Sequence, residues 1–280
     1  GSYMSEDDDL SFNTAEEMNT PMLQRGAHPP KGTVRTGRRG RTPRTAHGNR
    51  RTKGTSSTTV VDVAQAKEEL VGHLMVGDAN RVTEVLKTVY NAEPVIPLTD
   101  LIQPAQSSVL MMQCFKEPGS LIYADQTLKV LLDTLGADVN HVESETGMTL
   151  LHYMVEQDEK KLGKILISKG ADILLEDCHN VSPLSLSLSK GVEWLLQEFQ
   201  SSGRQTRLLE SNNSDGKLKY ATVLIHAGHS ELAAQVIRDG GLQITPEDAS
   251  QLFASCRGNF EHMKDPIATF ELLESLGATY

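Results

Sequence analysis

Four residues in the middle of this sequence have side chains that bind metal ions or act as nucleophiles and bases. They are His141, His152, Cys178 and His179. A zinc site needs several Cys or His ligands at characteristic short spacings, and this spacing fits no such pattern. Cys178 and His179 are adjacent in sequence, and the pattern shows no carboxylate that would orient the histidine as the base of a nucleophile. The sequence therefore predicts neither a metal site nor a catalytic cysteine.

Phosphate-binding and cofactor-binding patterns are also absent from the sequence. The glycines at Gly32 and at Gly240-Gly241 lack the Lys-Ser/Thr that follows a phosphate-binding loop. We therefore expect no enzymatic activity, no cofactor and no small-molecule substrate.

The densest run of charge lies near the N-terminus, where cations follow one another without an acid. Mostly Gly, Thr and Pro separate them, and a segment so poor in apolar side chains cannot offset its ordering entropy. We expect residues 1–59 to form a disordered tail, acidic at first and then basic. This basic arm has the chemistry to contact nucleic-acid phosphates, direct nuclear import, dock on a protein, lie on an acidic surface of its own chain or act as a linker. The basic arm consists of Lys31, Arg35, Arg38, Arg39, Arg41, Arg44, Arg50, Arg51 and Lys53.

Composition limits the compartment and the class of protein. The 280 residues carry 27 Lys/Arg and 37 Asp/Glu. Residues 1–59 hold ten of the cations and six of the acids, which leaves residues 60–280 with 17 cations and 31 acids. Three widely spaced cysteines argue against a disulfide framework and for a reducing compartment. No apolar run approaches the length of a membrane span, and the N-terminus lacks the apolar core of a signal peptide. We expect a cytoplasmic or nuclear protein.

A phrase that occurs twice predicts the fold. Residues 147–152, Gly-Met-Thr-Leu-Leu-His, recur in altered form as residues 180–185, Asn-Val-Ser-Pro-Leu-Ser, about 33 residues later. The Leu-Gly-Ala-Asp of residues 135–138 likewise returns as Lys-Gly-Ala-Asp at 169–172. A repeat of this length is typical of stacked helical units, none of which can bury its own apolar face.

The repeated phrase resembles the T-P-L-H motif that opens the first helix of an ankyrin repeat. Thr149 caps the helix, Pro183 suits the first helical position, and His152 is expected to hydrogen-bond between neighbouring units. The chain differs from the motif at three positions: Leu150 replaces the proline, Ser185 replaces the histidine, and Asp158 replaces the glycine between the helices. We expect these departures to weaken bonding between repeats without moving the apolar positions.

Apolar spacing extends the same division over residues 60–280, which we expect to form one ankyrin-repeat domain. Two longer connections, residues 91–103 and 200–217, do not fit a plain repeat, and the second is polar enough to be a surface excursion. The sequence thus predicts an all-α, ankyrin-like solenoid of about six repeats. The six expected helix pairs are 66–77 with 81–90, 107–115 with 124–135, 149–157 with 161–169, 182–189 with 192–200, 220–227 with 230–239, and 245–255 with 266–276.

The resemblance implies a protein-interaction module, a scaffold or adaptor, that binds a partner on its concave face. The set of residues that it implies is acidic with a few apolar points, so a partner with a basic segment and an apolar anchor is the natural complement. The alternative is a nuclear regulatory factor that contacts chromatin or nucleic acid through residues 31–53 and uses the repeats to bind a partner. The implied partner-binding residues are Glu145, Thr146, Met148, Glu156 and Gln157 in the third unit, and Glu176, Cys178, His179, Val181, Ser189 and Lys190 in the fourth.

Overall fold

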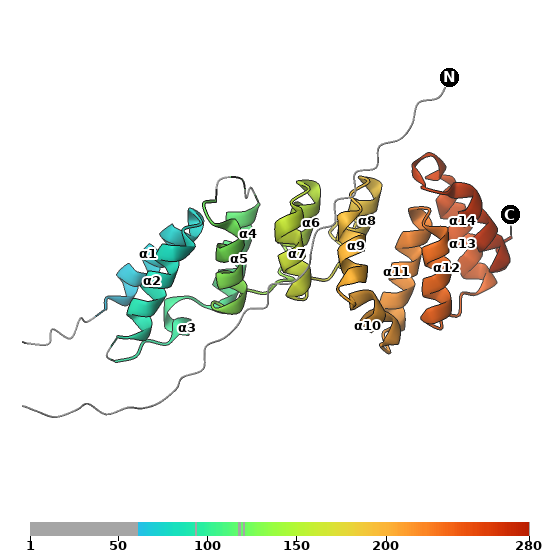
Figure 1. Ribbon diagram of the computed structural model, residues 1–280. Helices are drawn as coiled ribbons and strands as arrows, with labels where there is room; N and C mark the ends of the chain where they lie inside the picture. Colours follow the sequence, from blue (N-terminus) through green and yellow to red (C-terminus); the bar gives the residue numbers. More distant parts are fainter. Residues whose placement is uncertain (1–60, 93, 117–118, 120, 280) are drawn as a thin grey trace, which may run out of the picture. The chain divides into compact units, whose positions relative to one another are not determined.

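The computed structural model of the protein describes residues 61–92, 94–116, 119 and 121–279. Within these residues the secondary structure is helical, without a β-strand, and the helices follow one another as a stack of pairs (Figure 1). The expectation of an all-α, ankyrin-like solenoid is confirmed. The tail expected over residues 1–59, with the basic arm, lies outside the described residues.

Six helix pairs follow one another, and each corresponds to a pair expected from the sequence. Two short helices, α3 (Leu98–Leu101) and α10 (Arg204–Glu210), and a 3-10 turn at Phe260–His262 lie outside or between the pairs' main helices. The first helices are α1 (Val63–Met75), α4 (Pro104–Phe115), α6 (Leu150–Glu156), α8 (Pro183–Ser189), α11 (Ser214–His226) and α13 (Pro246–Arg257). The second helices are α2 (Ala79–Tyr90), α5 (Ala124–Asp133), α7 (Lys160–Ser168), α9 (Trp194–Ser201), α12 (Ser230–Asp239) and α14 (Pro266–Ser275).

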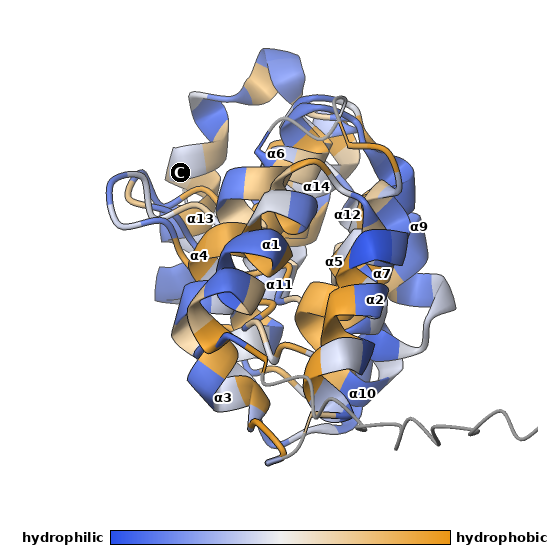
Figure 2. Ribbon diagram, turned by 90° about the vertical axis from the view of Figure 1, so that its left-hand side faces the viewer, coloured by the Kyte–Doolittle hydropathy of each residue, from blue (hydrophilic) through white to orange (hydrophobic). Residues whose placement is uncertain are grey.

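Apolar side chains fill the space between the row of first helices and the row of second helices. Figure 2 shows hydrophobic residues gathered between α1, α4, α11 and α13 on one side and α2, α5, α7 and α12 on the other. Met111, Met154 and Trp194 are buried in this core, as their helical spacing predicts. Because each unit covers its apolar face with its neighbours, the described repeats form one continuous core.

The start of α6 shows how the repeated phrase links the third unit to the fourth. Thr149 is the N-cap residue of α6, and its backbone N–H donates to Nδ1 of His152 at 3.0 Å. Because Nδ1 accepts this bond, the proton of the neutral ring lies on Nε2, which donates to the carbonyl oxygen of Val181 at 3.0 Å. The expected bond between units is confirmed. In the fourth unit, Ser185 bonds only to Ser182 at the start of its own helix.

The turn from α6 to α7 corrects one expectation. Four of the described turns between paired helices contain a left-handed residue, which is glycine at Gly77, Gly191 and Gly228 but Asp158 here, with φ 55°. The carboxylate Oδ1 of Asp158 accepts a hydrogen bond from Nε1 of Trp194 at 2.8 Å. This departure from the repeat motif therefore adds a bond between units, and the expectation that it weakens such bonding is wrong.

The two long connections contain helices that the sequence pattern did not indicate. Within residues 200–217, α10 packs Leu208 and Leu209 against the core, and Oη of Tyr220 donates to Oε1 of Gln205 at 3.1 Å. Asn213 caps α11 by accepting the N–H of Gly216 at 2.9 Å, and such caps use the residue types of polar loops. Residues 200–217 thus contain a helix, although α10 has no fully buried residue and residues 212–215 are exposed, as expected for a surface segment. The shorter helix α3 in the other connection is followed by a buried Ile102.

Helix α10 interrupts the regular stack between the fourth and fifth units. The second helices α2, α5, α7 and α9 each pack on the next, and α12 packs on α14. Between these two groups, packing runs from α9 to α10 and from α10 to α11. The first helices α8 and α11 still contact each other. The insertion therefore separates the fourth unit from the fifth mainly on the side of the second helices.

Candidate partner-binding surface

The loop before α6, which we call the third finger (residues 143–148), is held in place by the carboxylate of Glu143. Lys116 forms an ion pair with Oε1 of Glu143. Oε2 of Glu143 accepts hydrogen bonds from Oη of Tyr153 and, at 2.8 Å, from Oγ1 of Thr146. Hydrogen bonds from Lys116 and then from Tyr153 lower the pKa of Glu143 to about 2. The third finger is thus fixed to the end of α4 by a charged group that stays ionised at neutral pH.

The loop before α8, the fourth finger (residues 176–181), lies against the third. The backbone N–H of Cys178 donates to the carbonyl oxygen of Thr146 at 3.0 Å. The carboxylate of Asp177 accepts the N–H groups of His179 and Val181 at 2.8 and 2.9 Å. A side chain at Gly147 would place its Cβ only 2.8 Å from the nitrogen of Cys178. Backbone contact of this closeness makes the two fingers one continuous surface.

The residues predicted to bind a partner fall into two neighbouring groups. Most are exposed, while Thr146, Met148 and Val181 are half-buried. The third and fourth fingers carry Glu145, Thr146, Met148, Glu176, Cys178, His179 and Val181, and the C-terminal ends of α6 and α8 carry Glu156, Gln157, Ser189 and Lys190.

Three residues of this set hold neighbouring parts of the protein. Thr146 supports Glu143, Gln157 donates to the carbonyl oxygen of Lys116, and Nζ of Lys190 donates to the carbonyl oxygen of Glu156 at 3.3 Å. By contrast, the side chains of Glu145, Glu156 and Glu176 are exposed and form no ion pair or hydrogen bond with any described residue. These three are the unpaired carboxylates of the predicted surface.

Cys178 and His179 form a small polar contact on the fourth finger. Sγ of Cys178 lies 3.2 Å from Nδ1 of His179, and Oδ2 of Asp177 lies 3.9 Å from the same nitrogen. In a nucleophile–base arrangement the orienting carboxylate holds the other ring nitrogen, so this geometry does not form such a relay. No group of three or more His, Cys, Asp or Glu in the described residues is arranged to hold a metal ion. All three cysteines are free thiols.

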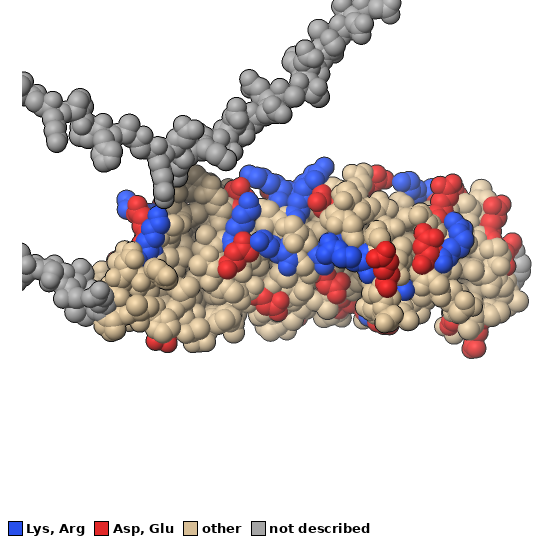
Figure 3. Space-filling view, turned by 60° about the horizontal axis from the view of Figure 1, so that its bottom comes forward, with Lys and Arg blue, Asp and Glu red and all other residues tan. Residues whose placement is uncertain are grey.

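The surface of the second helices carries charge of both signs. Ion pairs link α5 to α7 and α7 to α9, through Lys161 with Asp125 at 3.2 Å and Lys164 with Glu198 at 2.7 Å. Figure 3 shows Lys and Arg interspersed with Asp and Glu on one face of the protein. No described helix has both the length and the apolar content of a bilayer-crossing segment.

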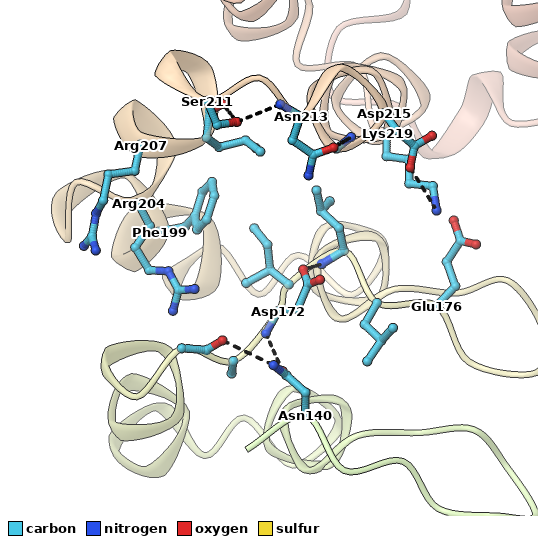
Figure 4. Close-up of a pocket in the computed structure, with 17 residues that line it drawn as sticks. Asn140, Asp172, Glu176, Phe199, Arg204, Arg207, Ser211, Asn213, Asp215 and Lys219 are labelled. Carbon is cyan, nitrogen blue, oxygen red and sulfur yellow. Dashed lines mark hydrogen bonds and ion pairs between the residues drawn. The ribbon is translucent and has the colours of Figure 1, made fainter. Parts of the chain in front are cut away.

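Two adjoining hollows lie between the fourth and fifth units, and no sequence pattern indicated them. The first, of about 710 Å³, is bordered by α10, the start of α11 and the loop after α7. In Figure 4, Arg204 and Arg207 lie toward one end of it, whereas Glu176 and Lys219 lie toward the other. The second, of about 700 Å³, separates α8 from α11, and we call it the α8–α11 groove. Leu174, Glu176 and Lys219 border both hollows, so the two are continuous.

The α8–α11 groove is lined by both apolar and polar residues, and it includes three residues predicted from the sequence, Glu176, Val181 and Ser189. Its apolar members are Leu174, Val181, Leu188, Leu218, Val223 and Ala227, and its polar members are Glu176, Asn180, Ser182, Ser185, Ser189, Lys219, Thr222, His226, Asn259 and His262.

One buried and one half-buried histidine, each at a junction between units, predict that stability falls with acidification. His226 links α11 to α13, because its Nε2 lies 2.8 Å from Oγ of Ser255. Desolvation lowers the pKa of His152 and the pKa of His226 below the usual 6.5. Below that value the unfolded chain binds more protons than the folded chain. The stability from these neutral rings is present above pH 6.5 and is lost as the pH falls through their folded pKa. Urea unfolding at about pH 7.5 and about pH 5.5 measures the loss.

A non-titrating replacement provides the control for this pH dependence. His152→Gln offers an acceptor and a donor at the same place but carries no proton-dependent charge. The variant should lose less stability between the two pH values than the unchanged protein. Equal losses in both proteins would contradict a contribution from His152.

Comparison with known proteins gives one distant similarity. No family model matches the chain. Over 137 residues it is 29% identical to a protein of Acanthamoeba polyphaga mimivirus that is named as an ankyrin repeat protein. The aligned part is 48% of this chain and 18% of that protein, so the chain spans less than a fifth of the relative's length. This similarity agrees with the helix pairs and finger loops described above, and it supports their description as ankyrin-like repeats.

Proposed function

We propose that residues 60–280 form a protein–protein interaction module, a scaffold or adaptor, that binds a partner on the third and fourth fingers and the adjacent ends of α6 and α8. The observation that carries the proposal is the set of unpaired, exposed carboxylates of Glu145, Glu156 and Glu176 on a surface that the two fingers hold in place. Residues 60–280 also carry an excess of acids. Both features favour a partner with a basic segment.

The proposal assigns no catalytic step, cofactor or small-molecule substrate to the chain, and it places the protein in the cytoplasm or nucleus. Free thiols at Cys114, Cys178 and Cys256 agree with a reducing compartment. The alternative function in chromatin or nucleic-acid binding depends on residues 31–53, which lie outside the described residues.

Charge reversal at the three free carboxylates should weaken partner binding by about ten-fold or more, because like charges then face the basic segment. The triple variant Glu145→Lys, Glu156→Lys, Glu176→Lys is compared with the unchanged full chain in affinity capture from extracts of the source cells, followed by titration of the captured protein. Exposed substitutions usually change the free energy of unfolding by no more than about 0.5 kcal/mol each, so folding should be retained.

A second triple variant controls for net charge. Asp239→Lys, Glu271→Lys and Glu274→Lys change the charge equally at exposed positions of α12 and α14. This control should bind as the unchanged chain does. Loss of binding in both variants would indicate a general charge effect, and retention in both would place the partner elsewhere.

A further inference from the structure

The interruption of the stack leaves the α8–α11 groove between two otherwise regular units. Helix α10 contacts α9 and α11, while α8 and α11 remain neighbours. The adjoining hollow beside α10 shares Leu174, Glu176 and Lys219 with the groove.

The groove is poor in charge and rich in apolar and hydroxyl groups. Leu218 on α11 is 40% exposed, and Leu188 and Val223 are half-buried beside it. Apart from His226 and His262, the only ionisable residues that border the groove are Glu176 and Lys219. Depletion of charge is typical of the buried part of a protein–protein interface.

One charge of the groove has no partner. Lys219 lies 3.8 Å from Asp215, one turn away on the same helix. Glu176 is exposed and bonds to no described residue. Its carboxylate stands at the junction of the two hollows, on a part of the chain whose acids outnumber its cations by 31 to 17. A cation in a bound segment would meet a free acid there.

We infer that the α8–α11 groove binds a peptide segment of a partner protein in which an apolar side chain stands next to Lys or Arg. The apolar side chain enters between Leu188, Leu218 and Val223, and the neighbouring cation lies against Glu176. The inference rests on the proposed function and adds to it an anchor between the fourth and fifth units. Short peptides owe most of their affinity to one or two such anchors.

A library of random 12-residue peptides displayed on phage, selected on the full chain, tests the inference. The enriched peptides should share a Leu, Ile, Met or Phe next to Lys or Arg. Synthetic copies should bind Leu218→Glu about ten-fold or more weakly, because the new carboxylate must be desolvated against the bound apolar side chain. Glu176→Lys should weaken binding by a similar factor through repulsion of the cation.

Matched variants elsewhere on the first and second helices serve as controls. Val109→Glu changes an exposed apolar residue of α4 that is 46% exposed, and Glu271→Lys reverses an exposed charge on α14. Both should leave peptide affinity unchanged. Circular dichroism of each variant shows whether it folds, and Thr222→Lys fills the groove with a long side chain without changing its apolar residues.

The other outcomes overturn the inference in distinguishable ways. Peptides that respond to Glu145→Lys and Glu156→Lys but not to Leu218→Glu or Thr222→Lys would keep the proposed function and remove the groove. Failure to enrich any peptide, together with unchanged capture by the triple variant, would contradict both. A synthetic copy of residues 20–37 is titrated in parallel. If it binds the groove more tightly than every library peptide, the groove belongs to this segment of the chain itself.

Discussion

Replacing Gly163 by alanine should destabilise the protein by about 2 kcal/mol, although alanine is the better helix former. Gly163 lies within α7, and a Cβ there would come 2.2 Å from Cη2 and 2.7 Å from Cζ3 of Trp194. The indole cannot retreat freely, because its Nε1 donates to Asp158 and its ring is buried. Urea unfolding followed by circular dichroism measures the loss.

Gly72→Ala is the matched control for this substitution. Gly72 also lies within a helix, α1, but nothing stands within 4 Å of its Cβ position. There the same change should stabilise the protein by about 0.5–1 kcal/mol through helix propensity alone. Stabilisation by both substitutions would contradict the close packing of Trp194 on α7.

His152→Ala should destabilise the protein by about 2–4 kcal/mol. The imidazole is fully buried, and its removal leaves the N–H of Thr149 and the carbonyl oxygen of Val181 without this partner. Each buried polar group that loses its partner costs about 1–3 kcal/mol, although Val181 keeps a bond from the N–H of Asp177. Because His152 joins two units, hydrogen exchange should also accelerate at the start of α8.

Ser185→Ala tests the same position one unit later. Ser185 is half-buried and bonds only to Ser182 within its own turn. Its removal should cost only about 1 kcal/mol. If the two alanine variants are equally stable, the bond from His152 to the fourth unit contributes nothing beyond a local cap.

Local chemistry made much of the fold predictable from the sequence. Thr149 and His152 sit three residues apart at the start of a helix, so the cap and the imidazole bond follow from one short motif. Helices α3 and α10 were missed because their flanking Pro, Ser and Asn residues are equally common in loops and at helix ends. The indole bond to Asp158 and the fit of Trp194 on Gly163 join residues more than 30 positions apart, and neither has a local pattern.

The candidate site was predictable only in part. Position within the repeat indicated that Glu145, Glu156 and Glu176 would be exposed, because the fingers and helix ends of each unit face outward. It did not indicate that Thr146 and Gln157 would hold neighbouring segments. The α8–α11 groove depends on how two units are spaced, and helical periodicity carries no information about that distance.

The most direct test of the proposed function is amide hydrogen exchange of the full chain with and without the partner protein captured above. The account predicts slower exchange in the third and fourth fingers, residues 143–148 and 176–181, and at the ends of α6 and α8, because bound segments shield these amides from solvent. The second helices α5 and α7 should exchange at unchanged rates. Protection confined to α5, α7 and α9, with the fingers unaffected, would contradict it.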